Sequence, residues 1–170
     1  CLSRGLGDVY KRQPLVCGLE RVQPTLDDLK AFSAAFATSS AAPLFHIAGV
    51  TPEARDPQRV IHSGATLQTE QVSHADLRRS WDELNSAREA RVGLIALGNP
   101  HFSFSEFAHL ATLCAGRSRH PEVSLVITSS RAVLEQACAA GHAAVLEAFG
   151  ATLLNDTCWC MLGEPVVPTN

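Results

Sequence analysis

Four groups of polar side chains follow apolar stretches of the sequence, and they contain residue types that bind metals and move protons. They are His46/Thr51/Glu53, Asn99/His101/Ser103, Thr128/Ser129/Ser130 and Asp156/Thr157/Cys158. Thiolates and imidazoles are metal ligands, while imidazoles and carboxylates serve as general acids or bases. Hydroxyl and amide groups orient a polar ligand by hydrogen bonding. The four groups therefore indicate a site for a small polar ligand, although helix capping alone would explain several of the serines, threonines and aspartates.

The cysteines divide into two kinds. Cys158 and Cys160 are too close in sequence for a Cys-x-x-Cys redox pair or for half of a common zinc site. In an extended segment, residues two apart point to the same side, so both thiols could face one metal. One metal ligand beside one packed thiol is an equally good interpretation. Cys114 and Cys138 lie on apolar helix faces, where we expect them to be packed as small hydrophobic residues.

The two histidines and the glutamate in these groups each have a functional and a structural interpretation. His101 follows a proline in a turn, where its ring could reach a ligand or could simply be solvated. His46 lies inside an apolar strand, where a hydrogen-bonded core histidine is the common outcome. Glu53 could act as an acid, a base or the cap of the next turn. No glycine-rich dinucleotide motif, phosphate-binding loop or Gly-x-Ser-x-Gly motif is present, so a nucleotide cofactor is not favoured.

The elements that must position these groups alternate between apolar strands and amphipathic helices. Strands are expected at residues 15–17, 44–48, 93–98, 123–127 and 151–154, with a weaker one at 70–72. Three helices should begin at capping boxes, which are Thr25 with Asp28, Ser73 with Asp76, and Ser103 with Glu106. The second of these helices carries Leu77, Trp81 and Leu84 on one face. Two further helices should run through residues 133–138 and up to Gly150.

Fully apolar strands separated by helices predict an α/β fold with a mainly parallel sheet flanked by helices. In such a sheet the carboxyl ends of the strands meet at one edge, where free helix amides can also receive an anion. We therefore expect all four polar groups to lie along one edge. We also expect the strand at 93–98 to end at Gly98, so that Asn99, His101 and Ser103 form the turn into the next helix.

The composition of the 170-residue chain fits one globular domain, with 46% hydrophobic and 18% charged residues. The formal net charge is −3 and no basic stripe is present, so a nucleic-acid partner is not expected. No apolar run approaches the roughly 20 residues that cross a bilayer, and no signal-peptide pattern is present, so a membrane partner is not expected either. We expect a cytoplasmic protein whose six cysteines are thiols or metal ligands.

The two ends of the sequence differ from the rest. Residues 1–13 end in Asp-Val-Tyr-Lys-Arg-Gln, which resembles translated sequencing-adapter sequence; a short surface segment is the other interpretation. We expect a non-native segment at 1–13 and a partial domain over 14–170, incomplete at both ends.

Four segments together resemble the large, catalytic subunit of the aconitase X family, in the family's order and approximate spacing. They are residues 44–54, 97–103, 127–130 and 155–160. The resemblance covers about residues 14–170. It implies a partial aconitase X catalytic domain with a three-layer, aconitase-like arrangement.

The resemblance implies an iron–sulfur hydro-lyase, a dehydratase of a small hydroxy acid. Bacterial members of the family include enzymes that convert cis-3-hydroxy-L-proline to 1-pyrroline-2-carboxylate, and archaeal members include a mevalonate 5-phosphate dehydratase. The archaeal type carries a cysteine where this chain has Asn99, which favours the hydroxyproline reaction. A large subunit of the mevalonate 5-phosphate dehydratase type and a non-catalytic α/β carboxylate-binding module are the alternatives.

The resemblance also assigns roles to residues. Cys158 would be the best local ligand of an iron–sulfur cluster and Cys160 a weaker one, with the other ligands and a catalytic serine outside this sequence. Contacts with substrate or around the cluster would come from Asn99, His101, Ser103, Thr128 and Ser129. The type of cluster and the general base are left open. A small aconitase X subunit or a fused swivelling domain would complete the site.

Overall fold

The computed structural model describes residues 13–40, 42, 44–61, 64 and 66–163. The chain divides into two compact units, residues 1–89 and 90–170, and each is described by itself. Residues 1–12 lie outside the described part, so the interpretation of residues 1–13 as a non-native segment stays a prediction. None of the helices in the described ranges combines the length and apolar character needed to cross a bilayer.

The first unit contains a two-stranded parallel sheet in which β1 pairs with β2. Helix α1 connects the two strands and begins at the predicted Thr25/Asp28 capping box. The rings of Phe32 and Phe36 on this helix lie 4.9 and 4.8 Å from the ring of Phe45, and these aromatic contacts hold α1 beside the start of β2. In chain order the elements are β1 (Leu15–Val16), α1 (Leu26–Ser39), β2 (His46–Ile47), the 3-10 turns η2 (Pro52–Ala54) and η3 (Pro57–Arg59), and α2 (His74–Leu84).

Helix α2 begins at Ser73 as predicted, but its apolar face is open. Leu77, Trp81 and Leu84 are 59%, 70% and 87% exposed, and no residue of α2 is buried within the described part of the chain. The strand expected at 70–72 is not formed, and residues 66–73 run without regular structure into the helix cap. A strand is stable only when its backbone pairs with a neighbour, and here the short β-favouring stretch has none among the described residues.

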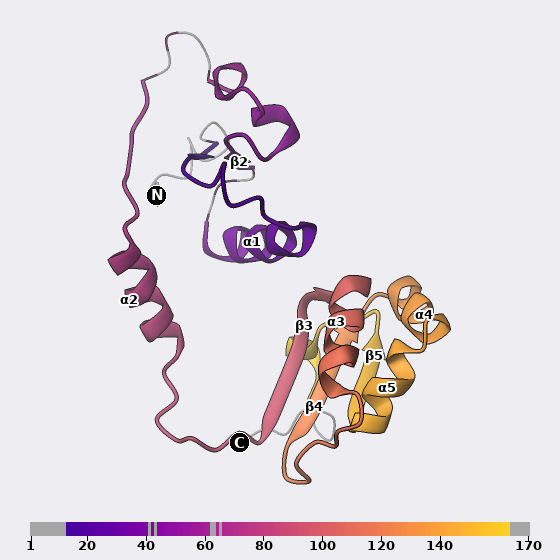
Figure 1. Ribbon diagram of the computed structural model, residues 1–170. Helices are drawn as coiled ribbons and strands as arrows, with labels where there is room; N and C mark the ends of the chain where they lie inside the picture. The colour runs from indigo at the N-terminus through magenta and orange to yellow at the C-terminus, as the bar shows by residue number, and fades with distance from the viewer. Residues whose placement is uncertain (1–12, 41, 43, 62–63, 65, 164–170) are drawn as a thin grey trace. The chain divides into compact units, whose positions relative to one another are not determined.

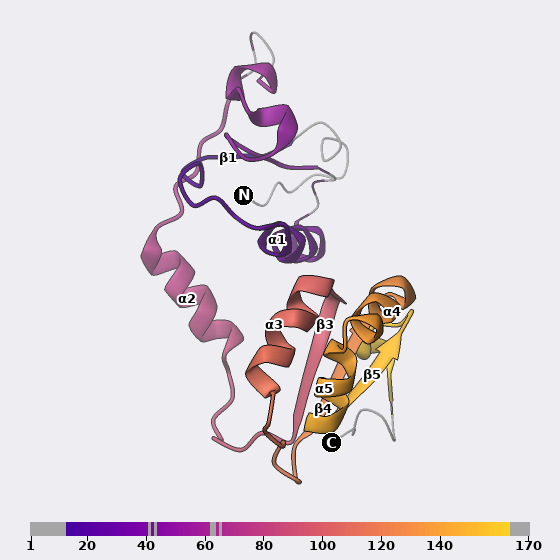
Figure 2. The same ribbon diagram turned by 45° about the vertical axis from the view of Figure 1, so that its right-hand side comes forward.

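The second unit is a three-stranded parallel sheet, in the order β3-β4-β5, with three helices. Figures 1 and 2 show α3 and α5 on one side of this sheet and the short turn η4 on the other. The predicted class, parallel sheets flanked by helices, is therefore confirmed, although the expected single sheet is two separate sheets. In chain order the elements are β3 (Leu94–Phe102), α3 (Phe104–Cys114), β4 (Ser124–Ser129), α4 (Arg131–Ala139), α5 (His142–Phe149), β5 (Ala151–Asn155) and η4 (Trp159–Met161).

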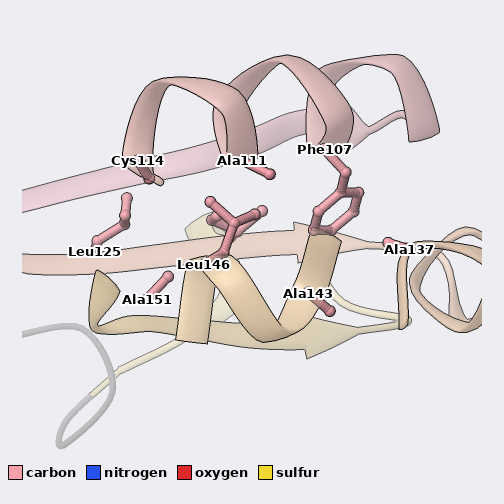
Figure 3. Close-up of a cluster of buried hydrophobic side chains, with 9 residues drawn as sticks. Phe107, Ala111, Cys114, Leu125, Ala137, Ala143, Leu146 and Ala151 are labelled. Carbon is pink, nitrogen blue, oxygen red and sulfur yellow. The ribbon is translucent and has the colours of Figure 1, made fainter. Parts of the chain in front are cut away.

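The core of the second unit lies between the sheet and its helices (Figure 3). Leu125 and Ile127 of β4 point to the helical side, where Phe107 of α3 and Leu146 of α5 pack with them. Burial of each such side chain contributes about 1.5–3 kcal/mol. Small residues fill the remaining space between the helices and the sheet, namely Ala111, Cys114, Ala137, Ala143 and Ala151. Side chains alternate along a strand, so the buried residues Val126 and Thr128 face the other side of β4.

The two helical cysteines have different environments. Cys114 is buried as expected, and loss of hydration raises the pKa of its thiol. Cys138 is exposed, so the prediction that it packs in the core is wrong. Ala137 occupies the core position in α4. Cys138, the next residue, projects about 100° further round the helix axis and therefore points away from the core.

Strand β3 is longer than predicted. Instead of ending at Gly98 it continues to Phe102, and its pairing with β4 shifts between Leu97 and Phe102. Gly98 has a φ of +100°, a conformation that other residues rarely adopt. A Cβ atom at this position would also collide with the backbone carbonyl of Thr128. Gly98 is therefore required both by its backbone conformation and by the close approach of β4.

The substitution Gly98→Ala should destabilise the second unit by at least about 2 kcal/mol, because it adds left-handed backbone strain to a backbone collision. Unfolding in urea, followed by circular dichroism, measures the change. Gly93→Ala is the matched control, since a Cβ there meets no atom within 4 Å; its effect should stay within about 0.5 kcal/mol. Equal stability of the two variants would contradict the conclusion that glycine is required at position 98.

Candidate functional site

The carboxyl ends of β3, β4 and β5 bring three of the four polar groups together, as expected for a parallel sheet. His101 of β3 reaches past the central strand, and its Nε2 lies 2.8 Å from the carbonyl oxygen of Thr157, which follows β5. The backbone N–H of Asp156 donates to the carbonyl oxygen of Ser129 at 2.9 Å, which extends the pairing of β4 with β5 by one bond. The end of β3 is thus connected directly to the segment that carries Cys158.

The fourth group, around His46, does not belong to this edge. His46 lies in β2, which pairs with β1 in the separate sheet of the first unit, so the prediction that all four groups share one edge is wrong. Alternation of strands and helices predicts parallel strands but does not determine which strands pair. His46 is buried, as expected, but its Nδ1 has no hydrogen-bond partner among the described residues.

The residues after β2 form a compact turn. The Thr51 hydroxyl accepts a hydrogen bond from the backbone N–H of Ile47 and donates one to its carbonyl oxygen. These two bonds hold the turn against β2. Glu53 is exposed, and it lines an open hollow of about 410 Å³ together with Pro52, Arg59 and Val60. These contacts give Thr51 a structural role and leave the role of Glu53 open.

Thr128 and Ser129 use their hydroxyl groups to hold the irregular end of β3. Thr128 Oγ1 donates to the carbonyl oxygen of Gly98 at 2.9 Å, and Ser129 Oγ donates to that of Phe102 at 2.6 Å. Both residues are 0% exposed. Each such bond contributes about 1 kcal/mol, and a carbonyl left without its donor would cost more. Both residues therefore position β3, and their expected contact with substrate stays a prediction.

Asn99 and His101 are exposed on this segment, whereas Ser103 is half-buried. Ser103 caps α3 in the predicted capping box: its N–H donates to the Glu106 carboxylate at 2.7 Å, and its hydroxyl accepts from the Glu106 N–H at 3.2 Å. Because the Thr157 carbonyl can only accept, the Nε2 atom of His101 carries the proton in their contact. This hydrogen bond fixes the ring orientation at the edge of the sheet.

Asp156 occupies the amino end of α4. Its Oδ1 accepts the backbone N–H of Arg131 at 3.0 Å, and its Oδ2 accepts from the Arg131 guanidinium at 2.9 Å. The Arg131 backbone N–H is the main cause that lowers the pKa of Asp156, and the guanidinium and the nearby His101 lower it further. We expected free backbone amides at the start of a helix to receive an anion. At Arg131 this expectation is not met, because the carboxylate of Asp156 already accepts the backbone N–H. The sequence alone did not assign Asp156 a role in the site. The backbone at Asp156 has a left-handed φ of +54°, a conformation that aspartate tolerates better than most residues.

Cys158 and Cys160 converge and form what we call the thiol pair. Cys158 is extended and half-buried, Cys160 is exposed, and the turn η4 begins between them. The Cys160 thiol donates to Cys158 with the two sulfurs 2.9 Å apart, and this bond raises the pKa of Cys160. Within the described ranges, no group of three or more His, Cys, Asp or Glu side chains is arranged to hold a metal ion. The thiol pair is therefore at most part of a metal-ligand set in this portion of the chain.

Comparisons with known proteins identify both units. Residues 6–82 match the aconitase X second domain, and residues 92–170 match the aconitase X third domain. The crystal structure of Thermococcus kodakaraensis aconitase X in its holo-form aligns with a TM-score of 0.72 and 28% identity, over 86% of this chain and 36% of that chain. The parallel strands and flanking helices thus define an aconitase-type α/β protein. The chain belongs to the aconitase X family.

Curated relatives refine the comparison. The chain is 60% identical over 155 residues to the cis-3-hydroxy-L-proline dehydratase of Pseudomonas aeruginosa, and 47% identical over 159 residues to that of Hypocrea jecorina. It is 35% identical over 143 residues to the phosphomevalonate dehydratase large subunit of Methanothermobacter thermautotrophicus. These alignments cover 91%, 93% and 84% of this chain, but the chain spans only 27%, 27% and 34% of the respective relatives. The resemblance seen in four short segments is confirmed.

The lowered pKa of Asp156 predicts a pH dependence of stability. Its ionised form stabilises the fold above the ordinary aspartate pKa of about 4, and this contribution is lost as the pH falls through the lower folded value. Asp156→Asn should therefore lose less stability than the parent chain between about pH 6 and pH 3. Urea unfolding at both pH values measures the difference.

Arg131→Gln is the companion variant. This variant removes the guanidinium but keeps the backbone N–H. The pH dependence of its stability should therefore fall between that of Asp156→Asn and that of the parent chain. If the stability of Asp156→Asn depended on pH as strongly as that of the parent chain, the pairing of Asp156 with Arg131 would not stabilise the fold.

Proposed function

We propose that this chain is part of a hydro-lyase that dehydrates cis-3-hydroxy-L-proline to 1-pyrroline-2-carboxylate. The observation that carries the proposal is the 60% identity to the Pseudomonas aeruginosa dehydratase over 155 residues, which extends into both units. Identity to the phosphomevalonate dehydratase large subunit of Methanothermobacter thermautotrophicus is 35%. The family resemblance, which implies a cysteine in the archaeal type at the position of Asn99, supports the same choice.

The reaction removes a proton from C2 and a hydroxide from C3 of the substrate ring. The C2 proton lies α to a carboxylate and is only weakly acidic, so the reaction needs a base, and hydroxide is a poor leaving group that needs assistance. The enamine that forms then rearranges to the cyclic imine. The catalytic base stays unassigned.

The edge formed by β3, β4 and β5 is the proposed substrate site. Asn99 and His101 are exposed there, and the Asn99 amide can both donate to a carboxylate and accept from a hydroxyl. Ser103 lies at the start of α3 beside them. Thr128 and Ser129 would act mainly by holding the segment from Gly98 to Phe102 in place, and their direct contact with substrate is a separate part of the proposal.

An iron–sulfur cluster is the proposed cofactor, and the thiol pair fits part of its ligand set. Thiolates are the common ligands of such clusters, and Cys158 follows Thr157, whose carbonyl contacts His101. Cys160 would have to release its hydrogen bond to Cys158 before both sulfurs could bind metal. When bound, the cluster would supply Lewis-acid assistance to the departure of the hydroxyl group.

The remaining ligands and a catalytic serine would come from other parts of the complete enzyme. A small aconitase X subunit or a fused swivelling domain is the proposed partner, and the archaeal relative is itself named as a large subunit. The cytoplasmic location expected from the sequence stays a prediction.

A chimera tests the proposed reaction. Residues 14–163 of this chain would replace the matching segment of the Pseudomonas aeruginosa dehydratase, with the unmodified dehydratase as control. We expect the chimera to form 1-pyrroline-2-carboxylate from cis-3-hydroxy-L-proline, detected by NMR, whereas the isolated 170-residue chain should be inactive. Turnover of phosphomevalonate instead would favour the alternative substrate. A folded chimera with neither turnover nor visible cluster absorption would favour a carboxylate-binding module.

The same chimera tests the metal ligand. Cys158→Ala should abolish visible absorption and bound iron, because it removes a thiolate ligand. Cys114→Ala is the matched control: that thiol is buried in the core, so its loss should cost about 1–2 kcal/mol of stability and leave the iron content unchanged. Equal loss of iron in both variants would show that the thiols are wrongly assigned.

A further inference from the structure

The two sulfurs of the thiol pair lie unusually close together. Their separation is 2.9 Å, whereas non-bonded carbon atoms pack at about 3.5–4.0 Å and a disulfide bond measures about 2.05 Å. A displacement of less than about 1 Å would therefore bring the sulfurs to bonding distance. Cys158 is extended and Trp159 begins the turn η4, so the bend that produces this convergence is already present in the backbone.

The thiol pair is also accessible to a small reagent. Cys160 is exposed and Cys158 is half-buried, whereas Cys114 is buried in the core. The other thiols in the described ranges lie on separate elements: Cys17 follows β1 in the first unit, and Cys138 lies on α4. The pair thus combines access from solvent with a second thiol in immediate reach.

We propose that Cys158 and Cys160 are a dithiol site that closes to an internal disulfide by exchange with a small-molecule disulfide such as glutathione disulfide. One thiolate of the pair attacks a sulfur of glutathione disulfide, which forms a mixed disulfide and releases one glutathione. The second thiolate then attacks the protein sulfur of that mixed disulfide and releases the other glutathione. The protein loses two electrons and two protons, and glutathione disulfide becomes two glutathione thiols.

This inference does not rest on the proposed dehydratase, because it concerns only the two thiols and their separation. Its consequence for a metal enzyme is direct, since a closed disulfide offers no thiolate to iron. If Cys158 binds iron as proposed, oxidation of the pair would block metal loading there.

The test uses the full 170-residue chain, reduced and then incubated with mixtures of glutathione and glutathione disulfide in the presence of a chelator. After acid quenching, cleavage at Glu147 and Glu164 releases residues 148–164, which contain Cys158 and Cys160 and no other cysteine. Mass spectrometry should find this peptide two hydrogens lighter and free of glutathione. Because the second thiol is held in place, closure should need a roughly tenfold lower proportion of glutathione disulfide than glutathionylation of Cys138.

Single variants separate closure from ordinary thiol reactivity. Cys158→Ser and Cys160→Ser should each carry one glutathione on the peptide, at the higher proportion of glutathione disulfide that Cys138 requires. Cys138→Ser should close like the parent chain, and circular dichroism checks that all three variants are folded. A parent peptide that carries glutathione without internal closure, or that stays reduced while Cys138 reacts, would overturn the proposal.

Discussion

Two buried hydroxyl groups on the central strand hold the end of β3, and the arrangement of the candidate site depends on them. Thr128 and Ser129 donate to the carbonyls of Gly98 and Phe102, so the segment between these two carbonyls is fixed at both ends without regular strand pairing. Neither hydroxyl is exposed to water, so loss of one donor would leave a carbonyl unsatisfied, at about 1–3 kcal/mol. The irregular segment can therefore present Asn99 and His101 outward while its backbone stays attached to the core.

Features that depend on neighbours in the sequence were predicted well. Three capping boxes place the starts of α1, α2 and α3 at Thr25, Ser73 and Ser103, and the structure confirms all three. Each capping box joins residues only three positions apart, so it forms wherever the helix forms. The apolar strands of the second unit were also recognised. The clearest case is β4, which is buried on both faces and therefore forms a continuous hydrophobic run.

Features that depend on distant contacts were not predictable in the same way. The continuation of β3 beyond Gly98 requires donors from β4, about 30 residues later in the chain. The separation of β2 from the second sheet reflects strand pairing, which an alternating pattern does not specify. Asp156 is a further case, because its partner Arg131 lies on another element and no local motif joins them. The convergence of three polar groups at the ends of β3, β4 and β5 was therefore predicted, while the contacts that shape this edge were not foreseen.

The carboxylate of Asp156 has a consequence for the charge balance of this edge. The amino end of a helix carries partial positive charge and commonly attracts a ligand anion, but in α4 an internal carboxylate has already neutralised it. An acidic substrate that approached α4 would have to compete with this intramolecular carboxylate. Electrostatic selection of an anion at this edge must therefore originate from groups other than the dipole of α4.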